Sequence, residues 1–195
     1  MSKISLPRLS RIQVGQKLVE IQQEIGEGAY GKVYKVKDVL TSSECALKVV
    51  ACSRQPRPGT TESDVMNEIQ TLRTISHPNV ISIIESGCYP LIPGPSTHVL
   101  ILTEYCSGGN LNDRLTQPSS KEVECKWILQ MAAALHFLLS RNVVHRDLKP
   151  ENVLLTATDD IKIGDFGLAR EFISFFSIPW GNDGWVIPYA SYYMK

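Results

Sequence analysis

Two polar segments in the second half of the sequence hold residues whose types and spacing suit phosphoryl transfer. The segment HRDLKPEN contains Asp147, Lys149 and Asn152, and Asp165 follows within the tripeptide DFG. A carboxylate can accept the proton of a hydroxyl nucleophile, a lysine can stabilise a transferring phosphoryl group, and carboxylate and amide oxygens are ligands for Mg²⁺. Each residue alone fits an ordinary capped turn, so only the combination indicates this chemistry.

A glycine-rich segment nearer the N-terminus has the pattern G-x-G-x-x-G-x-V from Gly26 to Val33. Alone, this pattern is weak evidence, because dinucleotide-binding folds use a similar one between a strand and a helix. Here the residues after Gly31, KVYKV, alternate as in a strand. The glycines are therefore expected at a hairpin, where backbone N–H groups can approach phosphate oxygens. This disfavours the alternative of a dinucleotide-dependent oxidoreductase.

Lys48 lies in the middle of the apolar segment CALKVVA. Strand alternation directs it to the same side as Ala46, toward the small core. Because an isolated buried ammonium group is costly, this lysine needs an anionic partner. Glu68 lies near the apolar stripe of a predicted helix and can supply one. For position 48 taken alone, a solvated lysine is the alternative.

In this order, the glycine-rich segment, A-L-K, the helix glutamate, H-R-D-L-K-P-E-N and D-F-G resemble the protein kinase family over roughly residues 19–170. The resemblance implies ATP and Mg²⁺ as cofactors. It also implies a bilobal α+β fold, with a five-stranded antiparallel sheet and one helix in the N-lobe and an incomplete, mainly helical C-lobe.

The resemblance further assigns roles to individual residues. Thr103 matches the gatekeeper behind adenine, and Glu104 and Cys106 would offer backbone groups to the adenine edge. Core packing explains the apolar positions equally well. The implied catalytic residues are Asp147, Lys149, Lys48 and Glu68, and the implied metal ligands are Asn152 and Asp165. The implied nucleotide contacts are Ile25, Gly26, Glu27, Gly28, Ala29, Tyr30, Gly31, Lys32, Val33, Ala46, Lys48, Thr103, Glu104, Cys106, Asn110 and Leu154.

The lysine of D-L-K-P-E-N, Lys149, resembles the serine/threonine branch of the family. The resemblance therefore implies transfer of the ATP γ-phosphate to Ser or Thr hydroxyls of protein substrates. Arg146 resembles the arginine on which a phosphorylated activation loop docks in one subclass. No A-P-E sequence follows D-F-G, so we expect a domain truncated in its activation segment. A catalytically incompetent ATP-binding or decoy fragment is the alternative.

Composition limits the classes of partner. Twenty Lys and Arg residues balance twenty Asp and Glu residues, for a net charge of +0, so no strong field indicates nucleic acid or an anionic membrane. The five cysteines form no C-x-x-C pair, which favours a reducing compartment, cytoplasmic or nuclear. No apolar stretch has the length of a membrane span. The oligomeric state stays open.

The elements expected to position these residues follow from the apolar patterns. Residues 1–18 predict a flexible leader, and residues 19–195 a kinase domain divided near residue 105. The predicted strands are 18–25, 32–39, 45–51, 79–86 and 98–106, and the predicted helices 65–75, 110–115 and 121–142. Short paired strands are expected at the ends of 142–155 and 160–170. The long helix should bury Val123, Trp127, Ile128, Met131, Leu135 and Leu138 and, because of the truncation, leave another apolar face uncovered.

Overall fold

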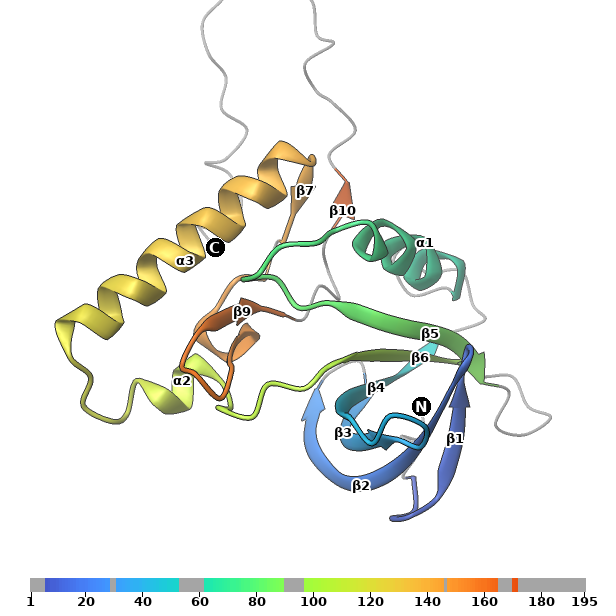
Figure 1. The fold of residues 1–195 in the computed structure, drawn as a ribbon. Coiled ribbons are helices and arrows are strands. Elements are labelled where there is room, and N and C mark those ends of the chain that lie inside the picture. The colour runs from blue at the N-terminus through green and yellow to red at the C-terminus, as the bar shows by residue number, and fades with distance from the viewer. Residues whose placement is uncertain are drawn as a thin grey trace, which may run out of the picture.

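The computed structural model describes residues 6–28, 31–52, 62–89, 97–145, 147–164 and 170–171. Within these residues, the N-terminal lobe contains one six-stranded antiparallel sheet in the order β1-β2-β3-β4-β6-β5 (Figure 1). Its strands are β1 (Arg11–Val14), β2 (Lys17–Gly28), β3 (Gly31–Asp38), β4 (Glu44–Cys52), β5 (Ile83–Tyr89) and β6 (Thr97–Glu104). The alternating segments that predict strands in this lobe all contribute to this sheet, which confirms the predicted fold class.

The first strand, β1, corrects the prediction of a flexible leader and of a five-stranded sheet. It pairs with the beginning of β2, and its side chains alternate between exposed and buried, with Ile12 and Val14 buried. Gly15 follows with a φ of 54°, a conformation that glycine adopts without strain. The alternating sequence R-I-Q-V therefore adds a strand because it buries two apolar side chains on the sheet. Residues 1–5 lie outside the described part of the chain.

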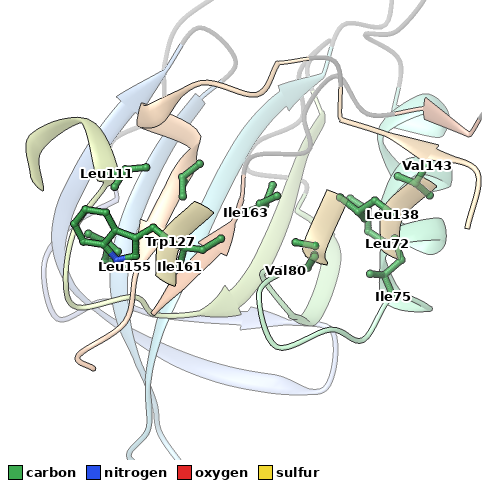
Figure 2. Packing of buried hydrophobic residues seen from close by; sticks show 12 residues of the cluster. Leu72, Ile75, Val80, Leu111, Trp127, Leu138, Val143, Leu155, Ile161 and Ile163 are labelled. Carbon is green, nitrogen blue, oxygen red and sulfur yellow. The ribbon is translucent and has the colours of Figure 1, made fainter. Parts of the chain in front are cut away.

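Helix α1 (Glu62–Arg73) packs on both lobes. Its Ile69 belongs to a small buried cluster with Cys52 and Val99 of the sheet. Its Leu72 instead joins the core of the C-terminal lobe, where Figure 2 shows it beside Leu138 of helix α3. The predicted apolar stripe of this helix is thus confirmed, and it connects the two cores.

The C-terminal lobe consists of short elements around one long helix. The apolar ends of the two polar segments pair as predicted in β8 and β9. The other pair differs in part from the prediction, because β7 pairs with β10, which consists of two charged residues and extends one residue past the predicted segment. The elements are α2 (Leu111–Arg114), α3 (Lys121–Ser140), β7 (Val143–Val144), the 3₁₀ turn η1 (Pro150–Asn152), β8 (Val153–Leu155), β9 (Ile161–Ile163) and β10 (Arg170–Glu171).

Helix α3 buries a narrower face than its sequence predicts. Trp127 and Leu138 are buried together with Ala134, and the predicted residues Val123, Met131 and Leu135 are half-buried against the same core. Ile128 was expected there but is 63% exposed, because it is rotated by one residue, about 100°, from Trp127. Leu129 and Leu139 are also exposed, so among the described residues an apolar face of α3 is uncovered, as expected.

Polar contacts fix the turn between β8 and β9 to α3. The Trp127 indole N–H donates to the Asp159 carbonyl over 3.0 Å. The Asp160 carboxylate accepts from Gln130 over 2.7 Å and pairs with Lys126 at 2.8 Å. Residues of the candidate site lie just before β8 and just after β9, so α3 supports the site through its contacts with the turn of this hairpin. None of the helices in the described ranges is long and apolar enough to cross a membrane.

Candidate active site

The backbone of the HRD segment is held in place by His145. This side chain is only 4% exposed, and its Nε2 lies 2.7 Å from the Gly164 carbonyl oxygen. Since a carbonyl can only accept, Nε2 carries the proton, and Nδ1 is left to accept the Asp147 backbone N–H over 3.4 Å. His145 therefore joins the segment before Asp147 to the residue that precedes Asp165.

Three of the predicted catalytic and metal residues meet directly at the end of this segment. The Lys149 Nζ lies 3.1 Å from Asp147 Oδ2. The Asn152 side-chain amide donates to the Asp147 carbonyl oxygen over 2.7 Å and to Asp147 Oδ2 over 3.0 Å. The hydrogen bond from Lys149, followed by that from Asn152, lowers the pKa of Asp147 from its ordinary value. The carboxylate is therefore ionised at neutral pH and can accept a proton.

The donor set around Asn152 fits a hard divalent cation such as Mg²⁺. The amide nitrogen is occupied by Asp147, so the Oδ1 oxygen faces away from that bond, and within the described residues it accepts no hydrogen bond. The Asn152 backbone carbonyl accepts from Gly164 N over 2.8 Å, which places beside it the residue that precedes DFG in the sequence. An amide oxygen next to a carboxylate is a suitable start for a Mg²⁺ site. The other implied ligand, Asp165, lies outside the described residues.

The register of the sheet places the predicted adenine and phosphate contacts on one face. Lys48 on β4 lies opposite Val33 on β3, and Ala46 lies opposite Thr103 on β6. Residues directly opposite each other in an antiparallel sheet share a face, as do residues two apart along a strand. Val33, Ala46, Lys48 and Thr103 therefore all face the same side, as a nucleotide site requires.

The orientation of Lys48 agrees with the sequence prediction. Lys48 shares a side of β4 with Ala46 and Cys52, and this side carries the small buried cluster to which Cys52 and Val99 belong. The larger core of the lobe lies on the other side, where Leu47 and Val49 are buried, and Lys48 itself is half-buried. Its predicted partner, Glu68, lies in α1, but the Glu68 side chain lies outside the described part of the chain. The ion pair between them stays a prediction.

The glycine-rich segment forms a hairpin instead of opening a helix. Gly28 at the end of β2 pairs with Gly31 at the beginning of β3, and Ala29 and Tyr30 between them lie outside the described residues. A β-carbon on Gly31 would overlap the Val49 carbonyl oxygen, so only glycine lets β3 approach β4 this closely. The expectation of a hairpin is confirmed. The dinucleotide-binding alternative is disfavoured, because it requires a helix after the glycines and β3 follows them instead.

Other residues of this segment are more open. A β-carbon on Gly26 would meet nothing within 4 Å, and Ile25 is 41% exposed. Glu27 is exposed and pairs in register with Lys32, whose ammonium group lies 2.9 Å from Glu24 Oε2. Lys32 therefore faces away from Val33, so a nucleotide contact from Lys32 would have to come from its backbone.

Residues 103–106, where the chain passes from β6 to the C-terminal lobe, form what we call the hinge. Their hydrogen bonds show which backbone groups are available to a nucleotide base. Cys106 is buried, and in the described part of the chain no group bonds to its backbone N–H or C=O. The Glu104 N–H is taken by Ser82 O over 3.2 Å. The Thr103 hydroxyl donates to the Glu104 carbonyl over 3.2 Å, an oxygen that has a second lone pair. The backbone of Cys106 is thus the freer partner for adenine.

Asn110 and Leu154 are brought together by an isolated β-bridge between them. Asn110 also caps α2, because its Oδ1 accepts the Asp113 N–H over 2.8 Å and its Nδ2 donates to the Asp113 carboxylate over 2.9 Å. This capping explains the residue without a ligand, and a ribose contact stays a prediction.

Sequence reasoning missed two features of the site. The first is Gly108, where a β-carbon would lie 2.7 Å from Thr156 O, so that the turn before Asn110 packs directly on β8. The consecutive glycines of SGGN are a signal for such a close approach. The second is Lys162, which forms an ion pair with Glu104. These two residues are far apart in the sequence, and no local pattern connects them.

Comparisons with known proteins agree with this geometry. The family model described as "Protein kinase domain" matches residues 19–182. CBL-interacting serine/threonine-protein kinase 21 of Arabidopsis thaliana is 36% identical over 77% of this chain and 35% of its own length. Serine/threonine-protein kinase 1 and serine/threonine-protein kinase ATG1b of the same plant are 34% and 36% identical over 88% and 77% of the chain, and 20% and 21% of their own lengths. The chain thus spans about a third or less of these relatives, and it belongs to the eukaryotic-type serine/threonine protein kinase family.

Proposed function

We propose that this protein transfers the γ-phosphate of ATP to serine or threonine hydroxyls of protein substrates. The observation that carries the proposal is the contact of Asp147 with both Lys149 and Asn152, at the end of a backbone segment anchored by His145. This arrangement holds an ionised carboxylate, a cation and an amide oxygen together, which is the set that phosphoryl transfer needs.

In the proposed reaction, Asp147 accepts the proton of the substrate hydroxyl. Its lowered pKa keeps the carboxylate ionised, and the Asn152 amide holds Oδ2 in a fixed orientation. Lys149, which is half-exposed beside Asp147, can stabilise the charge of the transferring phosphoryl group. Asn152 and Asp165 would hold Mg²⁺, which neutralises phosphate charge when it is bound.

The nucleotide is proposed to lie on the sheet face that carries Val33, Ala46, Lys48 and Thr103. Lys48 would bind its α- and β-phosphates, with Glu68 as the orienting partner. The Cys106 backbone would contact the adenine edge. Support comes from the shared face and from the free backbone groups of Cys106 among the described residues.

The proposed kinase domain covers residues 19–195, with the lobes meeting near residue 105, and β1 adds a strand from before residue 19 to its sheet. The family match supports this extent over residues 19–182. Protein substrates are proposed, and nucleic acid is not, because the chain has no net charge. None of the five cysteines, which all lie in the described ranges, is disulfide-bonded, and this supports a reducing, intracellular location.

The test is phosphate transfer from radiolabelled ATP to a generic serine/threonine protein substrate. The variant Asp147→Asn should lose at least about 100-fold in labelling, the usual contribution of a positioned general base. Asp159→Asn is the matched control, because the Asp159 side chain makes a single contact among the described residues, a 3.7 Å ion pair with Arg114, and its bond to Trp127 uses the backbone carbonyl. Asparagine tolerates its left-handed backbone (φ 59°). Thermal unfolding of both variants checks that the fold is retained.

Equal labelling by the wild-type chain and Asp147→Asn contradicts the catalytic role. A second measurement separates binding from transfer, because a ligand that binds only the folded state raises its unfolding temperature. Stabilisation by ATP and Mg²⁺ without any labelling would favour the alternative, an ATP-binding or decoy module without catalysis.

A further inference from the structure

An ion pair joins the hinge strand of the N-terminal lobe to a strand of the C-terminal lobe. The Lys162 ammonium of β9 lies 2.9 Å from Glu104 Oε1 at the end of β6. The Lys162 side chain is only 15% exposed and that of Glu104 30% exposed. Partly desolvated charges are costly to leave unpaired, so this pair differs from an ordinary surface salt bridge.

The Glu104 carboxylate is also fixed from a second side. Its Oε1 accepts the Ser82 N–H over 2.8 Å, while the Glu104 N–H donates to Ser82 O over 3.2 Å. Glu104 therefore lies between the segment before β5 and the lysine of β9. Since its own backbone belongs to the hinge, the position of its carboxylate constrains the backbone that adenine is proposed to contact.

Lys162 lies on the strand that also supports the catalytic loop. Two residues after it, Gly164 supplies the carbonyl that holds His145 and the N–H that binds the Asn152 carbonyl. A shift of β9 relative to β6 would therefore move the adenine side of the site away from the side that carries Asp147. The ion pair opposes such a shift at the hinge itself, whereas the Asn79 side-chain amide, which donates to the Ile161 carbonyl over 2.9 Å, and the backbone bonds of Ile163 hold β9 to the segment before β5.

The charge of Glu104 affects the pKa of the hinge residue Cys106. Burial and then the Glu104 carboxylate raise the pKa of the Cys106 thiol to about 11, and Lys162 acts in the opposite direction. Both members of the ion pair thus lie within electrostatic reach of Cys106, whose backbone groups are free among the described residues.

We propose that Lys162 is a positioning residue for the nucleotide base: through Glu104 it fixes the hinge backbone relative to β9, and it thereby sets the preference for adenine without touching the nucleotide. This role rests on the proposed ATP-binding function. It differs from a merely structural role in one respect. Loss of the positioning role should weaken binding of a nucleotide whose base hydrogen-bonds to the hinge backbone. It should weaken binding that depends on the phosphates alone to a smaller extent.

The experiment measures the ATP and GTP affinities of the full-length wild-type chain and of its variants. Each affinity is determined by competition against a fluorescent adenine nucleotide at one salt concentration. Lys162→Met keeps the length of the side chain and removes its charge. Lys17→Met is the control, because Lys17 pairs with the buried Asp38 at 3.0 Å in a remote turn. Thermal unfolding without nucleotide is recorded for each variant.

Lys162→Met should weaken ATP binding about five- to tenfold and GTP binding less than about twofold, so that the preference for adenine falls. Glu104→Gln should weaken ATP binding similarly. The double variant should be no worse than either single variant, because both remove the same interaction. Exchange of the two residues, Glu104→Lys with Lys162→Glu, should recover part of the preference. Lys17→Met should leave the ratio of the two affinities unchanged.

Two outcomes overturn the role of Lys162. One is an ATP affinity of Lys162→Met within about twofold of wild type. The other is an equal loss for ATP and GTP that follows the loss of thermal stability. A wild-type chain that binds neither nucleotide contradicts the proposed function and this role with it, and that failure is distinguishable because it appears before any substitution is made.

Discussion

The two outer glycines of the G-x-G-x-x-G segment should respond in opposite ways to the same substitution. A β-carbon on Gly31 would overlap the Val49 carbonyl oxygen and lie 2.8 Å from the Val49 carbonyl carbon. A β-carbon on Gly26 would meet nothing within 4 Å, and Gly26 is not among the described glycines with a positive φ. Gly31→Ala therefore forces backbone to move, whereas Gly26→Ala does not.

The cost of Gly31→Ala follows from the strand pairing. Restoring an ordinary contact of about 3.4 Å to the Val49 carbonyl carbon requires a shift of about 0.6 Å, and clearing the overlapping carbonyl oxygen requires β3 and β4 to separate by more than about 1 Å near the Gly31–Val50 pair. That displacement weakens or breaks ladder hydrogen bonds, each worth about 1 kcal/mol net, and an unsatisfied backbone group costs about 1–3 kcal/mol more. We expect a loss of about 2–4 kcal/mol in the free energy of unfolding. Gly26→Ala should change it by less than about 1 kcal/mol, with a gain favoured because alanine restricts the unfolded chain.

The assay is urea unfolding of both variants and the wild type, followed by circular dichroism without nucleotide. The expected result is a lower midpoint for Gly31→Ala at an unchanged slope, since the surface exposed on unfolding is the same. Equal midpoints for the two variants would refute the assignment of Gly31 to strand packing. A large loss for Gly26→Ala would show that the glycine-rich hairpin is more crowded than the structure places it.

Three further results are expected. Asp160→Asn should lower stability by about 1 kcal/mol at pH 7. Hydrogen bonds, first of all from Lys126, lower the pKa of Asp160, so the difference from wild type in urea unfolding should shrink as the pH falls below about 4. Burial lowers the pKa of His98, whose ring nitrogens bond to nothing in the described structure. Stability should therefore fall as the pH drops below about 6.5, and His98→Phe should reduce this dependence in thermal melts. Maleimide should modify the exposed Cys125 well before the buried Cys106, and mass spectrometry of digests at pH 7.5 would show the order.

Local periodicity predicts most elements of this fold because each apolar stripe must face a core. It failed where the decisive contact was not local. The R-I-Q-V sequence of β1 has the right alternation, but only its pairing with β2 shows that it is a strand. Ile128 is apolar and helical, yet the surface that would bury it is not among the neighbours of α3 in the described residues. Hydrophobicity alone cannot distinguish these cases.

The candidate site divides in the same way. The residue types of the HRD segment and of the glycine-rich segment predict which groups are present, because phosphoryl transfer needs a carboxylate, cations and oxygen ligands. They do not predict how those groups are held. The bond from His145 to the Gly164 carbonyl and the pairing of Lys162 with Glu104 both join residues distant in the sequence. Such contacts follow from strand register and from lobe packing, which no single segment encodes.

Strand β9 shows why these distant contacts matter for function. On one side Lys162 holds the hinge residue Glu104, and at its end Gly164 holds His145 and Asn152. The proposed role of Lys162 therefore aligns a base at the hinge and a hydroxyl at Asp147 through the same short strand. It predicts that small displacements of β9 change adenine preference and transfer rate together, whereas loss of Asp147 changes only transfer. The comparison of Lys162→Met with Asp147→Asn in both assays separates alignment from chemistry.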